Sequence, residues 1–123
     1  MSGNKFLLDT NAVLYILGGD KILAELLDGE KLYVSIITEL ELLSYKDITT
    51  KEKQYIKNFL ADIIVVNIDD AIRDKTIEIK KSSHLKLPDS IIAATASVLD
   101  IPFVTSDKQF KTVTNLNLLL YEK

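Results

Sequence analysis

The chain has 123 residues and a formal net charge of −3 at pH 7, with 47% hydrophobic and 27% charged residues. This is the size of one globular domain, which we expect to span residues 1–123, and the composition argues against disorder. The absence of Cys and the single His exclude disulfides, thiolate metal sites and zinc sites built on several imidazoles. Any bound metal would be held mainly by oxygen, which favours Mg²⁺ or Mn²⁺.

No apolar run approaches the roughly 18 residues of a membrane span. The first residues of the chain do not form the pattern of a secretory signal. We therefore expect a cytoplasmic protein that does not contact a membrane. Taken alone, the negative net charge does not favour nucleic-acid binding.

The first half of the chain alternates between short apolar runs and segments with helical spacing. We expect strands at residues 5–8, 32–36 and 63–68, and helices at residues 11–17, 20–28, 38–45 and 49–63. Gly18 and Gly19 stop the first of these helices, and Gly29 follows the second. The run IIVVNI at residues 63–68 has the clearest pattern of a buried strand.

The second half continues the alternation. A charged, exposed helix is expected over residues 69–83, and a second helix over residues 88–100 begins with Pro88. This second helix is apolar nearly all round, which is typical of a buried helix. Strands follow at residues 103–105 and 116–121. Strands separated by helices predict an α/β fold with a parallel sheet and helices on its faces.

Acidic residues lie where several of these strands end. In an open parallel sheet, ligands bind at the edge formed by the carboxyl ends of the strands. Asp9 follows the first strand, Glu41 belongs to the start of the helix after the second, and Asp107 follows the strand at 103–105. We expect these three to lie along one edge. Asp89 starts the apolar helix, but the pattern leaves open which edge that helix faces.

Each acid also has a simpler structural reading. Asp9 could cap the helix that follows it, and Asp107 could belong to a turn or a cap. Thr38 and Glu41 match a capping box, and Asp89 lies in a first helical turn, where a negative charge is favoured. Together, however, acids gathered at a strand edge repel one another and need a cation between them. Two Mg²⁺ ions in such a cluster could support phosphodiester cleavage by water.

Four blocks of the sequence occur in an order that can be recognised: FLLDTNAVLYIL, VSIITELELLSY, LKLPDSIIAATAS and FVTSDKQF. They resemble the PIN domain family, and in particular the small toxins of the VapC type. The resemblance implies a PIN-like three-layer α/β/α fold with a central parallel sheet of about five strands. It also implies a metal-dependent endoribonuclease that uses Mg²⁺ or Mn²⁺, acting as the toxin of a type II toxin–antitoxin pair.

The resemblance also implies site residues. Carried over position by position, the catalytic, metal-binding acids fall on Asp9, Glu41, Asp89 and Asp107. The polar residues that surround or support the metal fall on Asn11, Ser35 and Thr38. Two departures affect the fourth acid. The family often has Arg or Asn where this chain has Ser106, and another acid where it has Gln109.

The implied partners are an RNA substrate, a second copy of the chain in a homodimer, and an antitoxin protein that covers the acidic cleft. Tyr45 and Tyr55 could join the dimer surface or a partner groove. Basic residues exceed acids by three between residues 73 and 86: Arg73, Lys75, Lys80, Lys81 and Lys86 against Asp74 and Glu78. With Lys108 and Lys111 they could line a path for an RNA backbone, or they could form a solvated helix face.

Two other functions compete with the nuclease. A phosphatase of the haloacid-dehalogenase type normally has a second acid two residues after the first, and that position is Asn11. A catalytically inactive PIN-like protein-interaction module stays open as the alternative, although all four acids are retained. His84, on the loop before the Asp89 block, is expected to be a surface residue.

Overall fold

The computed structural model describes residues 3–122, so residues 1, 2 and 123 of the expected domain lie outside the described residues. The strands of the described part are β1 (Lys5–Leu8), β2 (Lys31–Ser35), β3 (Ile64–Val66), β4 (Phe103–Thr105) and β5 (Leu118–Leu120). Its helices are α1 (Thr10–Leu17), α2 (Lys21–Leu26), α3 (Ile36–Leu43), α4 (Thr50–Ala61), α5 (Asp70–Ser82) and α6 (Leu87–Leu99), with the 3-10 helix η1 (Lys108–Thr112). The single-domain boundary 1–123 stays a prediction.

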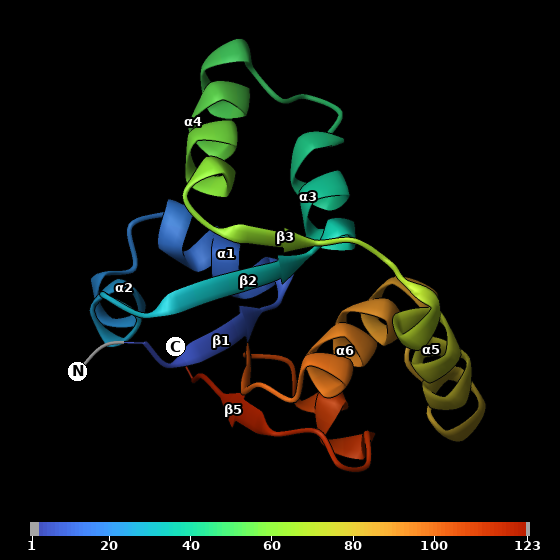
Figure 1. Cartoon of the computed structure of the whole chain (residues 1–123). Coiled ribbons are helices and arrows are strands. Elements are labelled where there is room, and N and C mark those ends of the chain that lie inside the picture. The colour runs from blue at the N-terminus through green and yellow to red at the C-terminus, as the bar shows by residue number, and fades with distance from the viewer. Residues whose placement is uncertain (1–2, 123) are drawn as a thin grey trace.

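The five strands form one sheet in the order β3-β2-β1-β4-β5, and every neighbouring pair is parallel (Figure 1). The chain starts in the middle of the sheet, builds one side through β2 and β3, and then returns to build the other side through β4 and β5. The order reverses between β1 and β4, and such a switch point opens a crevice at the strand ends. The expected parallel sheet of about five strands is confirmed.

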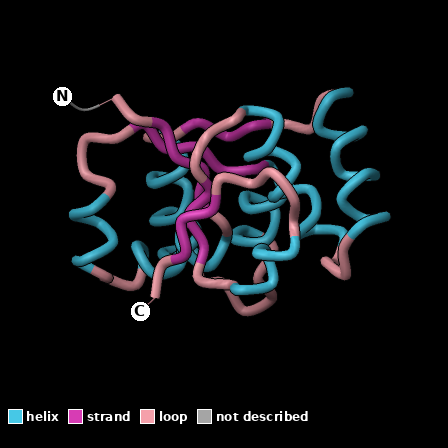
Figure 2. Tube along the Cα trace, turned by 90° about the horizontal axis from the view of Figure 1, so that it is seen from below, coloured by secondary structure: helices cyan, strands magenta, loops and turns pink. Residues whose placement is uncertain are grey.

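Helices cover both faces of this sheet, and strands and helices are stacked in three layers (Figure 2). Because side chains alternate along a strand, Leu7 of β1 packs into one core and Leu8 into the other. Phe103 and Val104 of β4 divide in the same way. The first core contains buried residues of α5, α6 and η1, and the second contains buried residues of α1, α2, α3 and α4. The expected α/β/α layering is confirmed.

The strand expected to be most buried is in fact an edge strand, and this prediction was wrong. β3 has only three residues, pairs with β2 alone, and leaves Ile64 37% exposed. Its Val65 and Val66 pack partly into opposite cores, which accounts for its apolar sequence. An apolar run indicates that both faces are covered, but it does not reveal how many strands lie alongside. The fully buried strand is β4.

The two long helices of the second half behave as expected. α6 buries six consecutive or near-consecutive residues, Ser90 and Ile92–Ala96, and starts with Pro at its first turn. α5 is charged and largely exposed, and it buries Ile72, Thr76 and Ile79 on one side. Each of these helices has 13 residues. Within residues 3–122, no helix has both the length and the apolar character needed to cross a membrane.

Candidate metal centre

A hollow of about 160 Å³ lies at the carboxyl ends of the central strands. It is lined by Asp9, Thr10, Asn11, Glu41, Asp89, Ile92, Asp107 and Phe110. We call it the acidic hollow. All four predicted acids line it, and Asp89, whose edge the sequence left open, joins the other three because α6 begins there.

Asp9 is the most buried of the four acids, with 4% of its surface exposed. It follows β1 directly and caps α1, so the cap reading is confirmed: Oδ1 accepts a hydrogen bond of 2.7 Å from the backbone N–H of Ala12. Oδ2 accepts a hydrogen bond from the hydroxyl of Thr105. Burial raises the pKa of Asp9, the two hydrogen bonds oppose this rise, and the nearby charges of Asp107 and Asp89 add to it.

The capping-box reading of Thr38 and Glu41 was wrong. α3 begins at Ile36, immediately after β2, and its N-cap is Ser35, whose Oγ accepts a hydrogen bond of 3.0 Å from the N–H of Ile37. With no loop between strand and helix, Thr38 and Glu41 fall inside the helix instead of at its start. Glu41 therefore projects from α3 into the rim of the acidic hollow.

A chain of hydroxyl groups holds Glu41. Thr10 Oγ1 donates to Glu41 Oε1 at 2.7 Å. The hydroxyls of Thr10 and Thr38 are hydrogen-bonded at 3.0 Å, and Thr38 is fully buried. Thr38 thus supports the site through Thr10. Thr10 was missed in the sequence, although its place directly after Asp9 and at the first position of α1 sets it at the same edge.

Asp89 lies in the first turn of α6 and is half-buried. Burial raises its pKa, the charges of Asp107 and Glu41 raise it further, and Lys86 opposes the rise. No described residue donates a hydrogen bond to the Asp89 carboxylate. The structure therefore leaves this carboxylate without the donor that a partly desolvated charge needs.

Asp107 lies in the turn between β4 and η1, and it caps η1, as the turn-or-cap reading predicted. Its Oδ1 accepts from the N–H of Gln109 at 2.9 Å, and its Oδ2 accepts from the Gln109 side chain at 3.4 Å. Gln109 stands where the family often has another acid, and here it donates to Asp107 instead.

Thr105 is the second residue that the sequence reading missed. This last residue of β4 is fully buried, and its Oγ1 donates to Asp9 and accepts from the backbone N–H of Asp107 at 3.0 Å. One hydroxyl therefore connects two of the predicted acids. The signal was a Thr at the end of the 103–105 strand, two residues before an acid.

The supporting residues divide into two groups. Asn11 is exposed and lines the acidic hollow. Ser35 and Thr38 are buried and do not line it; Ser35 caps α3, and Thr38 acts through Thr10.

The acidic hollow fits a hard divalent cation by its donor set, which consists of carboxylate and amide oxygens without thiol or imidazole. Among residues 3–122, no group of three or more Asp, Glu or His side chains is arranged so that it could hold a metal ion as it stands. Burial is the main cause of the raised pKa of Asp9 and Asp89, and the charges of the neighbouring carboxylates add to it. A cation would reduce the repulsion between the carboxylates and would give Asp89 the partner that no described hydrogen-bond donor supplies.

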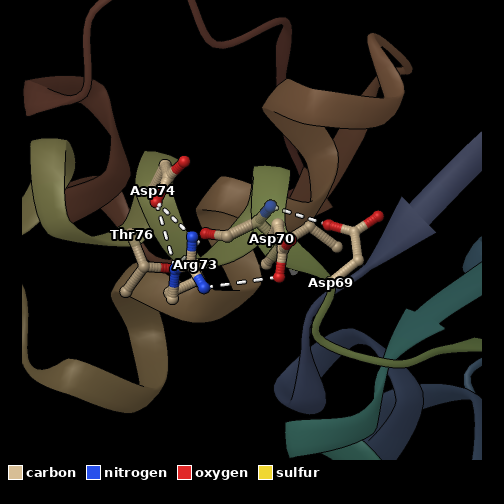
Figure 3. A network of polar contacts seen from close by, with 6 residues as sticks. Asp69, Asp70, Arg73, Asp74 and Thr76 are labelled. Carbon is tan, nitrogen blue, oxygen red and sulfur yellow. Dashed lines mark hydrogen bonds and ion pairs between the residues drawn. The ribbon is translucent and has the colours of Figure 1, made fainter.

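Some of the basic residues expected to guide RNA are paired along α5. Arg73 binds Asp70 at 3.3 Å and Asp74 at 3.1 Å (Figure 3). Lys75 pairs with Glu78 at 3.2 Å. Lys86 lies at the N-terminal end of α6 and acts electrostatically on Asp89. Lys86, at the start of α6, therefore brings positive charge to the acidic hollow.

An apolar groove of about 220 Å³ adjoins the acidic hollow. It is lined by Thr10, Leu14, Glu41, Leu42, Tyr45, Ile48, Glu52 and Ile56, so Thr10 and Glu41 belong to both. Tyr45, which was expected on a partner surface, lies here and is 64% exposed. Tyr55 lies outside this groove, on the exposed side of α4.

Comparisons with known proteins agree with this architecture. A chain of a toxin–antitoxin complex from Klebsiella pneumoniae is 25% identical and superimposes with a TM-score of 0.82, over 95% of this chain and 98% of that one. VapBC2 from Rickettsia felis, bound to a DNA fragment from its promoter, is 21% identical and superimposes with a TM-score of 0.81, over 96% of this chain and 99% of that one. VapBC-1 from nontypeable Haemophilus influenzae is 22% identical and superimposes with a TM-score of 0.78, over 94% of this chain and 97% of that one.

No curated protein sequence matches the chain significantly. The sequence profile of the PIN domain, however, matches residues 6–116, which include all four acids of the hollow. The chain therefore belongs to the PIN domain family.

Proposed function

We propose that the protein is a metal-dependent endoribonuclease and the VapC-like toxin of a type II toxin–antitoxin pair, with cytoplasmic RNA as its substrate. The observation that carries the proposal is the convergence of Asp9, Glu41, Asp89 and Asp107, from four separate segments, on one hollow. Burial raises the pKa of Asp9 and Asp89, and the neighbouring carboxylates raise it further, so a bound cation would stabilise their ionised forms. PIN domains are generally nucleases, and this supports the same conclusion.

The four acids would hold Mg²⁺ or Mn²⁺, which when bound neutralises charge on the phosphate and makes water a better nucleophile. Asp9 and Glu41 enter with fixed orientations because Thr105, the Ala12 N–H and Thr10 hold their oxygens. Asp89 has no such donor, so its carboxylate is free to turn toward the cation or toward the attacking water. Attack of that water on phosphorus breaks the P–O bond to the leaving oxygen, which takes up a proton.

The substrate would approach from the side of α6 and η1. Lys86 precedes Asp89, and Lys108 follows Asp107, so both sit beside the acids in the chain. Lysines bind backbone phosphates without reading the base sequence. The adjoining apolar groove is lined by Glu41 and Glu52, whose charges are unfavourable to a polyanion.

An antitoxin segment would cover the apolar groove. The solved relatives from Klebsiella pneumoniae, Rickettsia felis and Haemophilus influenzae are toxin–antitoxin or VapBC assemblies by their descriptions. A groove with an apolar floor and two glutamates suits a peptide with apolar and basic side chains. Such a segment would also reach Glu41 and so block the acidic hollow. A homodimer is proposed on the family resemblance alone.

A catalytically inactive protein-interaction module is the second candidate. It is favoured by the apolar groove and by the finding that, within residues 3–122, the acids do not already stand in an ion-holding arrangement. The two candidates differ in what a divalent ion does to the protein.

The test is cleavage of a mixed pool of structured RNAs by the purified protein, with Mg²⁺, with Mn²⁺ and with chelator, beside a single-stranded DNA pool. Asp9→Asn and Asp89→Asn are assayed in parallel. Metal-dependent cuts in RNA that vanish in both variants support the nuclease. Equal cutting by wild type and variants contradicts it. Absence of both cleavage and a metal-induced rise in Tm supports the interaction module, because an ion that binds the folded state must raise its stability.

A further inference from the structure

The turn that carries Asp107 is held by a bond to α1. The hydroxyls of Tyr15 and Ser106 are hydrogen-bonded, with 3.1 Å between their oxygens and 91 residues between them in sequence. Tyr15 belongs to α1, the helix that Asp9 caps. The bond therefore ties the residue before Asp107 to the helix that the first acid of the acidic hollow caps.

Tyr15 is itself held in place. Its ring packs against the ring of Tyr121, with 6.2 Å between centroids and 55° between planes. The Tyr121 hydroxyl donates to the carboxylate of Asp20, at 2.9 and 3.1 Å from its two oxygens. Asp20 caps α2. The ring that carries the Tyr15 hydroxyl is therefore held in place by Tyr121, near the end of the described chain.

Among the described residues, the carboxylate of Asp107 is held only from within its own turn. Its Oδ1 and Oδ2 accept from the backbone and side chain of Gln109, so these bonds do not fix the turn relative to α1. Thr105 holds only the backbone N–H of Asp107, from within β4. Ser106 lies between Thr105 and Asp107, and its hydroxyl connects this part of the turn to Tyr15 of α1.

We propose that Tyr15 is a positioning residue that acts through Ser106 to keep the Asp107 carboxylate beside the acidic hollow. The inference rests on the proposed function, since it takes Asp107 as a ligand of the divalent ion. It also gives Ser106 a role: the Ser106 side chain is short, and its hydroxyl connects the turn to α1 through the hydroxyl of Tyr15.

The experiment measures Mn²⁺ binding to metal-free protein by calorimetry, for wild type, Tyr15→Phe, Ser106→Ala and the double variant. Each single variant is expected to bind Mn²⁺ about 3- to 10-fold more weakly, the effect of one lost hydrogen bond behind a metal ligand. The double variant should be no weaker than the singles, because both remove the same bond. Ser106→Thr keeps the hydroxyl and should retain wild-type affinity.

Tyr121→Phe is the matched control. It removes one hydroxyl from the neighbouring ring, breaks the bond to Asp20 and leaves the Tyr15–Ser106 bond in place. It should lower Tm without changing the Mn²⁺ affinity. If Tyr15→Phe and Ser106→Ala likewise lower Tm and leave the affinity unchanged, or if their effects on affinity add fully, the positioning role is wrong.

Failure of the proposed function has a different signature. Wild type would then bind no Mn²⁺, or Asp9→Asn would bind it as tightly as wild type does, and the positioning role would fall with it. Wild-type binding that is lost in Asp9→Asn but unaffected by Tyr15→Phe and Ser106→Ala would overturn the positioning role alone.

Discussion

The hydroxyl of Thr105 donates a hydrogen bond to the carboxylate of Asp9, across 96 residues of sequence. The bond joins the carboxyl ends of β4 and β1, where the strand order reverses. Both residues are buried, and the same Thr105 oxygen accepts from the N–H of Asp107. The orientation of the first acid therefore depends on a side chain that does not line the acidic hollow.

Replacing Thr105 should lower the stability of the folded protein. Thr105→Val keeps the shape of the side chain but leaves Asp9 Oδ2 without its donor in a buried site. The free energy of unfolding should fall by about 1–3 kcal/mol, the range for a buried acceptor that loses its partner. Urea denaturation of metal-free protein measures this change.

Thr95→Val is the control for this substitution. Thr95 is also buried, and its hydroxyl donates to the Ile91 carbonyl at 2.8 Å within α6. Because the helix itself supplies a backbone donor to that carbonyl, the loss should stay below about 1 kcal/mol. Equal losses of unfolding free energy in the two variants would mean that the Thr105–Asp9 bond does not stabilise the protein more than an ordinary buried hydroxyl does.

Glu41 and Glu39 provide a comparison within one helix. Both belong to α3, but only Glu41 lines the acidic hollow and is held by Thr10. Glu41→Gln should reduce RNA cleavage by about 100-fold, because a ligand carboxylate becomes a neutral amide. Glu39→Gln should leave the cleavage rate within about two-fold of wild type. A similar loss in both variants would show that the assignment of Glu41 is mistaken.

Asp89→Asn should affect metal binding and stability in opposite directions. It removes a charge that burial and the carboxylates of Asp107 and Glu41 disfavour. The metal-free variant should therefore be as stable as wild type or up to about 1 kcal/mol more stable. The rise in Tm that Mn²⁺ causes in wild type should disappear. Thermal denaturation with chelator and with Mn²⁺ measures both effects, and a strongly destabilised metal-free variant would contradict the repulsion.

Stability should depend on pH through Asp9 and Asp89, whose pKa in the folded protein lies above the ordinary value of 3.8. The folded state holds these protons more tightly than the unfolded chain does. Their stabilising contribution is therefore complete below the unfolded pKa and is lost as the pH rises through the folded pKa. Metal-free protein should therefore become less stable as the pH rises above about 4, the ordinary pKa of an Asp side chain.

Mn²⁺ should act in the opposite direction over the same range, because it binds the ionised carboxylates. The difference in Tm between samples with Mn²⁺ and with chelator should therefore grow as the pH rises. The double variant Asp9→Asn and Asp89→Asn should lose this growth. A metal-induced rise in Tm that is independent of pH in wild type would contradict the role of these two acids.

Much of the fold follows from local patterns. The apolar run at 5–8, the glycines after α1 and the all-round apolar α6 each have a short-range cause, and the structure contains the corresponding elements. The alternation of strands and helices then requires a parallel sheet, since parallel strands need a crossover. Asp9 and Asp107 come to the same edge because both follow strands that run in the same direction.

Identical local patterns can nevertheless have different outcomes. Thr-x-x-Glu occurs at Thr38–Glu41 and at Thr49–Glu52. The second forms a complete capping box, with two hydrogen bonds of 3.0 Å, whereas the first lies inside α3. The difference arises because β2 runs directly into α3 and Ser35 takes the cap position. The Thr-x-x-Glu pattern makes a capping box possible, and the position of the preceding strand decides whether the box forms.

The remaining features depend on contacts between distant segments. The edge position of β3, the arrival of Asp89 at the acidic hollow, and the bonds from Thr105 to Asp9 and from Tyr15 to Ser106 have no counterpart in any short stretch of sequence. Local residue patterns determine which groups are available and which elements carry them. Only the packing of helices onto a sheet brings groups 91 or 96 residues apart within hydrogen-bonding distance, because that proximity is a property of the whole folded chain.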